Sequence, residues 1–401
     1  MRILWVKVGG LWPLNTGGRL RSFNTIAQLS RHHQVVVLTT HEAHEKADAL
    51  NAQLADCEMV QSFPFTAPKW RDPAYAATYI RASVSAMPVD VFKYRVPALR
   101  QEVSHLLTSQ KFDLCVCDFI FAVPNVRFDL GVPIVFFAHN VEHLILQRLG
   151  STIRMPVIKA VLAIEARKMR RYETAICSAA RLSIAVSPQD RDLLRTCAPA
   201  SASKIVAVPT GVDTDYFSPA DLPESPGELV FSGSMDWKPN EDAVRHFMAD
   251  ILPAIRRELP ETAFTVVGRN PSSRLRELAA LNAVKVTGTV DDVRPFINAA
   301  AVYVVPLRVG GGTRLKVFEA LSMGKAMVAS SLAVEGLPLT DGTHYLRADE
   351  PHDFAAKVVK LLRDREARRA LGEAGSALTR RNYAWPAVAR QFSDYCEAAV
   401  G

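Results

Sequence analysis

The sequence has no apolar run of the roughly 18 residues that a membrane-spanning helix needs, so we expect no such helix. Its six cysteines are scattered without the spacing of metal ligands, so we expect buried, reduced thiols. Residues 1–8 include Lys7 within an apolar stretch, and no small-residue cleavage site follows them. They predict a buried strand and not a signal peptide, and we therefore expect a cytoplasmic protein.

The length and the hydrophobic pattern indicate two domains. At 401 residues the chain is longer than one core usually holds. Short apolar runs alternate with amphipathic segments twice, which is typical of parallel sheets covered by helices. The expected strands are residues 3–8, 35–39, 114–118 and 134–138, then 229–232, 264–267, 302–305 and 326–330, with the proline-rich segment 208–226 between the halves. We predict two doubly wound, Rossmann-like α/β domains facing across a cleft, where ligands meet the carboxyl ends of the strands.

Residues 308–319 combine a glycine run with the start of an amphipathic helix. Gly310, Gly311 and Gly312 allow backbone N–H groups to approach an anion, and the helix that follows adds its positive dipole end. Thr313 is the expected cap, and Glu319 lies about 9 Å further along the axis, where ribose hydroxyls would fall. The segment predicts a site for a nucleotide diphosphate; a tight connection without a ligand is the alternative.

The second half offers further groups that could meet a diphosphate. Gly233 follows a predicted strand, and Ser234 and Lys238 come shortly after it. A lysine supplies a mobile positive charge to a leaving phosphate. Arg269 follows the next strand and is either another anion contact or a loop charge.

In the first half, Gly17 and Gly18 stand where a helix begins after the first strand, which suits an anion or a close substrate. No acidic residue follows about 20 positions later, so a nicotinamide dinucleotide site is disfavoured. His139 follows the fourth strand, where a neutral imidazole could hydrogen-bond a sugar hydroxyl or exchange a proton. Capping of the next helix is the alternative. Its spacing from Glu142 and His143 does not fit a zinc motif.

The net charge of +7 is concentrated in residues 144–171, where leucine, isoleucine and valine alternate with basic residues. These are Arg148, Arg154, Lys159, Arg167, Lys168, Arg170 and Arg171. Such a segment fits an anionic lipid surface, and a solvated helix face is the alternative. No aromatic platform accompanies the arginines, so we expect no nucleic-acid partner.

Four segments together resemble the retaining glycosyltransferases of the large family-four group, which have the GT-B fold. They are the glycines near the first helix, His139 with Asn140, residues 211–217, and residues 310–325. The resemblance implies an acceptor-binding domain over residues 1–208 and a nucleotide-sugar-binding domain over residues 209–383, with 209–226 as linker. It also implies a final helix over residues 384–401 that crosses back to the first domain.

The resemblance also assigns roles to residues. Glu319 would bind ribose, Lys238 would neutralise the diphosphate, and His139 would contact the transferred sugar as the catalytic residue. The expected donor site comprises Gly17, Gly18, Gly233, Ser234, Lys238, Arg269, Arg308, Gly310, Gly311, Gly312, Thr313, Arg314 and Glu319. Two departures from the family pattern stand out. Gly311 replaces the first of two glutamates, and Ser234 replaces an arginine, which leaves the diphosphate to Lys238 with help from Arg308 or Arg314.

The implied function is retaining transfer of a hexose from a nucleotide diphosphate sugar to an acceptor hydroxyl, in polysaccharide or glycolipid assembly. We expect a saccharide or lipid-linked saccharide acceptor and a peripheral position on the inner face of the cell membrane. No acidic DxD-like cluster ends a strand, so we expect no metal or other cofactor. A sugar-nucleotide epimerase and an inactive nucleotide-sugar-binding scaffold remain the alternatives.

Overall fold

A computed structural model describes the chain except residues 15, 43–46, 69–71, 154, 221–222 and 310–314. It divides into two compact units. Unit 1 comprises Met1–Thr210 and Val388–Gly401, and unit 2 comprises Gly211–Ala387. The sequence predicts that the first domain ends at residue 208 and the second at residue 383.

Unit 1 is built on a seven-stranded parallel sheet in the order β3-β2-β1-β4-β5-β6-β7. Its strands are β1 (Arg2–Lys7), β2 (Gln34–His41), β3 (Met59–Pro64), β4 (Leu114–Asp118), β5 (Ile134–Ala138), β6 (Leu182–Ala185) and β7 (Ile205–Ala207). β4 and β5 are buried along their whole length, as expected of central strands covered on both faces.

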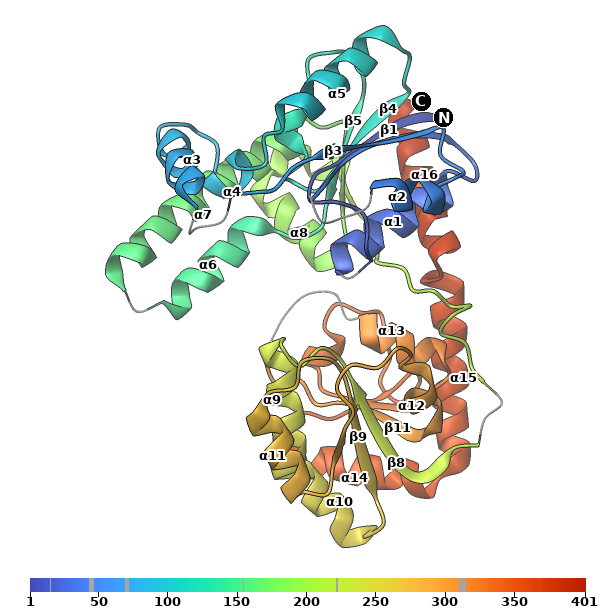
Figure 1. Cartoon of the computed structure of the whole chain (residues 1–401). Helices are drawn as coiled ribbons and strands as arrows, with labels where there is room; N and C mark the ends of the chain where they lie inside the picture. Colours follow the sequence, from blue (N-terminus) through green and yellow to red (C-terminus); the bar gives the residue numbers. More distant parts are fainter. Residues whose placement is uncertain (15, 43–46, 69–71, 154, 221–222, 310–314) are drawn as a thin grey trace. The chain divides into compact units, whose positions relative to one another are not determined.

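Helices flank this sheet (Figure 1). They are α1 (Gly17–Leu29), α2 (Ala47–Gln53), α3 (Pro73–Ser83), α4 (Val89–Phe92), α5 (Pro97–Ser109), α6 (Glu142–Thr152), α7 (Pro156–Ala179) and α8 (Pro188–Cys197), with short 3-10 helices η1 (Val123–Asn125) and η2 (Pro199–Lys204). The last part of α16 (Trp385–Val400) also belongs to unit 1, where the Phe392 ring lies 5.6 Å from that of Trp5.

Unit 2 carries a six-stranded parallel sheet in the order β10-β9-β8-β11-β12-β13. Its strands are β8 (Ser225–Ser232), β9 (Ala263–Val267), β10 (Lys285–Val286), β11 (Ala300–Val305), β12 (Met327–Ala329) and β13 (Leu346–Arg347). Its helices are α9 (Lys238–His246), α10 (Leu252–Glu258), α11 (Ser273–Leu281), α12 (Arg294–Ala299), α13 (Leu315–Ser322), α14 (Pro351–Arg363) and α15 (Arg365–Asn382), with a π-helical segment η3 (Phe247–Ile251) and a 3-10 turn η4 (Leu332–Val334).

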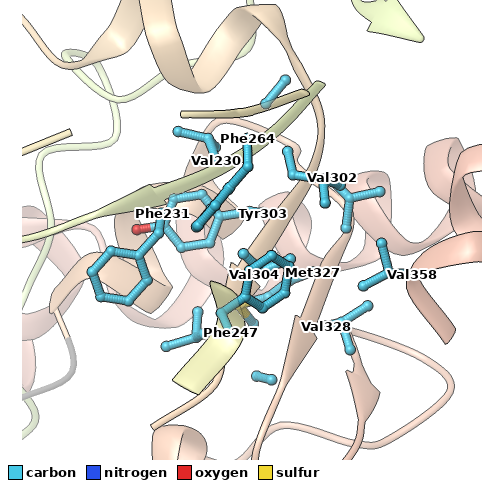
Figure 2. Packing of buried hydrophobic residues seen from close by; sticks show 14 of the residues in the cluster. Val230, Phe231, Phe247, Phe264, Val302, Tyr303, Val304, Met327, Val328 and Val358 are labelled. Carbon is cyan, nitrogen blue, oxygen red and sulfur yellow. The ribbon is translucent and has the colours of Figure 1, made fainter. Parts of the chain in front are cut away.

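The core of unit 2 lies between the sheet and its helices, and Figure 2 shows part of it. Phe231 of β8, Phe264 of β9 and Tyr303 of β11 are almost fully buried there. The one polar atom of the Tyr303 side chain is satisfied, because its hydroxyl lies 2.5 Å from Ser232 Oγ. The core therefore reaches the last residue of β8 without leaving a buried hydroxyl unpaired.

Each sheet reverses its winding direction once. In unit 1 the reversal lies between β1 and β4, and in unit 2 between β8 and β11. At such points the loops that follow the two strands diverge, and ligands of doubly wound proteins collect beside them. The structure thus confirms the predicted fold class and directs attention to the loops after β1, β4, β8 and β11.

Five strands were not predicted from the sequence. β3 is half-exposed, β10 and β13 contain two residues each, and β6 and β7 are short strands toward one edge of the sheet. Strands this short, or half-exposed along their length, do not produce a clear hydrophobic run in the sequence. Among the described residues, no helix is sufficiently long and apolar to cross a membrane. All six cysteines are free thiols, four of them buried.

Candidate functional site

The loops after β8 and β9 approach each other through two glycines. A Cβ atom on Gly268 would lie 1.8 Å from the carbonyl oxygen of Gly233, which no side chain could tolerate. Gly233 has φ of +151°, and its N–H donates to the Val267 carbonyl at 2.9 Å. The sequence places glycine at both positions because the two backbones are in contact there.

Lys316, on the first turn of α13, directs its ammonium group toward this loop. Its Nζ donates to Asn240 Oδ1 at 2.6 Å and lies 4.2 Å from the centre of the Phe231 ring. A Cβ atom on Gly233 would come within 2.5 Å of that Nζ, so the glycine leaves the space that the ammonium occupies. A positive charge therefore stands at the point where the winding of unit 2 reverses.

Asn240 connects this lysine to the rest of the loop. Its Nδ2 donates to the carbonyl oxygen of Ser234 at 2.8 Å while its Oδ1 accepts from Lys316. Neither residue is among those predicted from the sequence to bind the donor. The spacing could have indicated Lys316, because it precedes Glu319 by three positions and residues so spaced share one face of a helix.

Glu319 lies on the same helix and is half-buried. Burial raises the pKa of its carboxyl to about 7, although the nearby Lys316 opposes the shift. Within the described parts of the chain its carboxylate makes no hydrogen bond or ion pair. A carboxyl that is costly to ionise and lacks a partner is well suited to accept hydrogen bonds from ligand hydroxyls.

Ser234 and Arg269, which follow the paired strands β8 and β9, are in contact in the structure. Arg269 Nε donates to Ser234 Oγ at 2.7 Å, and the Ser234 hydroxyl donates to the Asp236 carboxylate. Asn270 Nδ2 also donates to Asp236, at 3.1 Å. These bonds hold the pKa of Asp236 below its usual value. The guanidinium is exposed but already has an anionic neighbour.

The other predicted donor residues of unit 2 either make no contact with this cluster that the described part of the chain shows, or lie outside the described residues. Lys238 begins α9, is exposed, and forms no ion pair or hydrogen bond with any described residue. Arg308 forms an exposed ion pair with Asp242 of α9 at 2.8 Å. Gly310, Gly311, Gly312, Thr313 and Arg314 lie outside the described residues.

In unit 1 the equivalent reversal is occupied by a buried cluster around Asp118, the last residue of β4. Lys7 and Asp118 are register partners of β1 and β4, and Trp5 lies two residues earlier, on the same face of β1. Trp5 Nε1 donates to Asp118 Oδ2 at 2.8 Å, and Lys7 Nζ donates to Oδ1 at 3.5 Å. Burial alone would raise the pKa of Asp118, but Lys7 and His139 outweigh it and lower the pKa.

His139, the predicted catalytic residue, is part of this cluster and is only 5% exposed. Its Nε2 lies 2.7 Å from Asp118 Oδ1, but the angle does not meet that of a hydrogen bond. Burial lowers the pKa of His139 to about 4, against the attraction of Asp118. The imidazole is therefore neutral at pH 7.

Gly17 and Gly18 begin α1, as predicted. Thr16 caps the helix by accepting from the backbone N–H of Arg19 at 3.4 Å. Arg19 also donates to the carbonyl oxygens of Trp12 at 2.9 Å and Gly9 at 3.1 Å, which ties the loop to the helix. A Cβ atom on Gly18 would lie 3.6 Å from His139 Nδ1, so the start of α1 packs against the imidazole.

Glu142 and His143 serve the start of α6. The buried Glu173 of α7 accepts from the backbone N–H of Glu142 at 2.7 Å, and it lies 2.6 Å from His143 Nδ1. A carboxylate at a helix N-terminus stabilises the unpaired N–H groups there. This arrangement accounts for both residues without a ligand.

Two family profiles match the chain. The profile described as Glycosyltransferase Family 4 matches residues 20–216, and the one described as Glycosyl transferases group 1 matches residues 226–364. The chain belongs to the family-four glycosyltransferases. The first match covers most of unit 1 in this glycosyltransferase, and the second covers β8 to α14, including the Gly233 loop and Glu319.

Characterised relatives share part of this glycosyltransferase sequence. Phosphatidyl-myo-inositol mannosyltransferase of Mycobacterium tuberculosis is 30% identical over 216 residues, which are 50% of this chain and 56% of the relative. The enzyme of the same name from Mycolicibacterium smegmatis is 29% identical over 212 residues, or 50% of this chain and 54% of the relative. The chain spans about half the length of the curated relatives it matches.

Solved structures support the fold of the glycosyltransferase over its whole length. A glycosyltransferase from Rickettsia africae superposes with a TM-score of 0.69 at 13% identity, covering 100% of this chain and 98% of the other. HepE from Anabaena in complex with UDP gives 0.66 at 13% identity, covering 99% and 100%. WaaG, described as involved in lipopolysaccharide biosynthesis, gives 0.61 at 13% identity and covers both chains fully. At these identities the likeness concerns the fold alone.

Proposed function

We propose that this protein is a retaining hexosyltransferase that takes its sugar from a nucleotide diphosphate donor. The observation that carries the proposal is the position of the Lys316 ammonium against Gly233, three residues from the Glu319 carboxyl, which has no hydrogen-bond or ion-pair partner among the described residues. A cation and a hydrogen-bond acceptor on one face of α13 match the adjoining diphosphate and ribose of a sugar nucleotide. The glycine run that precedes α13 in the sequence adds backbone N–H donors for phosphate.

In this proposal Lys316 stabilises the leaving diphosphate. The bond between the anomeric carbon and the phosphate oxygen breaks, a new bond forms to the acceptor oxygen, and the acceptor proton moves to the released phosphate. Negative charge grows on the diphosphate during this step. A fixed positive charge at that position typically contributes about 3–4 kcal/mol to transition-state stabilisation. The step requires no nucleophile from the protein and no divalent metal.

Glu319 is proposed to bind the ribose hydroxyls. Two hydroxyl donors would favour the ionised carboxylate, so ligand binding would release the proton that burial retains near neutral pH. His139 keeps the role implied by the resemblance, contact with the transferred sugar. With a pKa of about 4 it acts as a neutral hydrogen-bonding group and not as a cationic acid.

A saccharide or lipid-linked saccharide acceptor is supported by the relatives. Two of them are named phosphatidyl-myo-inositol mannosyltransferases, and one solved neighbour is described as acting in lipopolysaccharide biosynthesis. We propose mannose among the hexoses to test first, and we assign acceptor recognition to unit 1.

The proposal is tested first by nucleotide binding. We would measure thermal shifts of wild type, Lys316→Met and Glu319→Ala with UDP, GDP, ADP and TDP and their sugars. A ligand at 100 times its Kd should stabilise the wild type by about 2.7 kcal/mol, and both variants should lose most of this effect. An exposed lysine of unit 1, Lys204, supplies the control variant Lys204→Met, which should respond as wild type does.

Transfer is tested next with the nucleotide sugar that binds. NMR of the product should show the anomeric configuration of the donor, and EDTA should leave the rate unchanged. Inversion, or abolition by EDTA, would contradict the retaining or the metal-free part of the proposal. Isomerised donor without acceptor would indicate an epimerase. Binding without transfer to any saccharide or lipid acceptor would indicate a scaffold.

A further inference from the structure

The hairpin formed by α6 and α7 exposes an unusual amount of apolar surface. Among the described residues, six of the fourteen exposed large hydrophobic side chains fall within it. These are Ile145, Leu149, Met155, Val157, Ile158 and Ile164, each between 40% and 74% exposed. Figure 1 shows the two helices extending away from the sheet of unit 1. No other stretch of comparable length concentrates such side chains in the part of the chain that the structure describes.

The exposure follows from how the two helices pack. Gly150 is buried, and a Cβ atom there would lie 3.7 Å from that of Leu162, so the helices meet closely on their inner faces. Ile145 and Leu149 are four residues apart and therefore share one face of α6. Val157 and Ile164 are seven apart and share one face of α7. Hairpin packing thus uses the inner faces and leaves these residues outside.

In the part of the hairpin that carries the exposed apolar side chains, residues 143–164, charge has one sign. Residues 143–164 contain Arg148, Arg154 and Lys159 but no aspartate or glutamate. Arg148 and Lys159 are exposed. The next acidic residue, Glu165, faces α4, where it accepts from the backbone N–H of Val89 at 2.8 Å and pairs with Lys168 at 3.6 Å. The outer surface is therefore apolar and positive.

We propose that the α6–α7 hairpin binds the surface of an anionic phospholipid bilayer. Exposed apolar side chains beside basic ones match the boundary between acyl chains and negative headgroups. Symmetric pairing of two copies fits less well, because it would bring the same basic residues of both copies together. Lipid binding goes beyond the donor reaction because it needs no nucleotide. For residues 144–171 we therefore favour a lipid surface over a solvated helix face.

The test is co-sedimentation of the whole protein with vesicles. Wild type should bind vesicles of phosphatidylcholine mixed with phosphatidylglycerol and should not bind phosphatidylcholine alone. Combined reversal of Arg148→Glu and Lys159→Glu should weaken binding at least about tenfold, since each basic residue near the surface contributes about 1 kcal/mol. Combined Val157→Ser and Met155→Ser should also weaken it at low salt.

Matched controls lie in unit 2. Arg257→Glu with Lys360→Glu reverses two exposed bases there, and Leu281→Ser removes an apolar side chain that is 85% exposed. Both should bind as wild type does. Absence of wild-type binding, or equal weakening by the controls, would overturn the proposal. An oligomer formed by the wild type and lost in the combined Val157→Ser and Met155→Ser variant would also overturn the proposal. The exposed face would then join copies of the chain. Circular dichroism confirms folding of each variant, and nucleotide thermal shifts report the donor site separately.

Discussion

The two units share a topology, but they differ in the residues that occupy the point where the winding of the sheet reverses. Where unit 1 reverses its winding, Asp118 is enclosed by Trp5 and Lys7, and all three are buried. Where unit 2 reverses, Lys316 and Glu319 are half-buried, and no described residue pairs with the Glu319 carboxyl. Opposite charges that are satisfied within the protein fix loops in place. A carboxyl that lies near a cation and accepts no hydrogen bond from a described residue can instead accept one from a ligand.

The difference arises from the residues that end the strands. In unit 2, Gly233 and Gly268 bring two loops into backbone contact and leave space for an ammonium group. In unit 1, β4 ends in Asp118 followed by Phe119, whose φ of +77° is rare for a bulky residue. Its ring lies 5.1 Å from that of His139. Side chains therefore fill the space that glycine leaves open in the other unit.

The largest effect should come from breaking the buried pair of unit 1. Asp118→Asn leaves Lys7 buried without its counter-charge, which should cost about 3–5 kcal/mol. Hydrogen exchange measured on peptides of unit 1 would report the loss, and adding Lys7→Met should restore part of it. A control in unit 2 is Glu224→Gln. Its partner Lys325 still donates hydrogen bonds to the carbonyl oxygens of Asn298 and Ala300, at 2.8 and 2.9 Å. The loss of stability should therefore be smaller than for Asp118→Asn. Equal losses of stability in the two variants would show that burial does not increase the contribution of Asp118.

The next effect concerns the cation of unit 2. Lys316→Met keeps an unbranched side chain but removes the ammonium group that lies over the Phe231 ring, and kcat for transfer should fall about 10²–10³-fold. Lys238→Met should change kcat far less, because Lys238 is exposed and has no ion-pair partner among the described residues. Steady-state kinetics on both variants decides between them. A larger loss for Lys238→Met would restore the assignment made from sequence.

Glu319 should make nucleotide binding depend on pH. If the ligand binds the carboxylate, and the free group has a pKa of about 7, the affinity should rise about tenfold between pH 6 and pH 8. Calorimetry at several pH values would measure this. Glu319→Gln should bind more weakly and without the pH dependence. A wild-type affinity that falls as pH rises would contradict the ribose assignment.

The same carboxyl should affect stability without ligand. Its folded pKa is raised above the ordinary 4.5, so the folded state holds the proton more tightly than the unfolded state. Stability should therefore decrease as pH rises from about 4.5 to about 7, and Glu319→Gln should remove this contribution. Urea unfolding of both proteins across this window, followed by hydrogen exchange in unit 2, provides the comparison.

The smallest effect should come from Arg308→Ala. Its ion pair with Asp242 is exposed, and such pairs typically contribute about 0–1 kcal/mol. Thermal unfolding should shift little, and nucleotide affinity should stay near that of wild type. A tenfold loss of affinity would instead place Arg308 in the donor site, as the sequence analysis expects.

The sequence predicts the architecture well because the relevant signals are local. Residues 114–118 and 134–138 are strands with the same limits in the sequence analysis and in the structure, since each is a short apolar run between turns. The start of α1 at Gly17 likewise follows from a cap and glycines that are adjacent in sequence. Gly233 and Gly268 also follow their strands directly in the sequence, but only the structure shows that their two backbones are in contact.

Partners that are distant in sequence could not be found in this way. Lys7 and Asp118 are 111 residues apart, and Lys316 and Asn240 are 76 apart. Lys238 is the natural choice beside Gly233 because it is near in sequence, whereas Lys316, which the structure places against Gly233, is 83 residues away in the sequence. By itself the sequence determined the two wound sheets and the glycine turns, because these depend on neighbouring residues. The tertiary structure alone decided which charges meet, because strand order and helix packing set those distances.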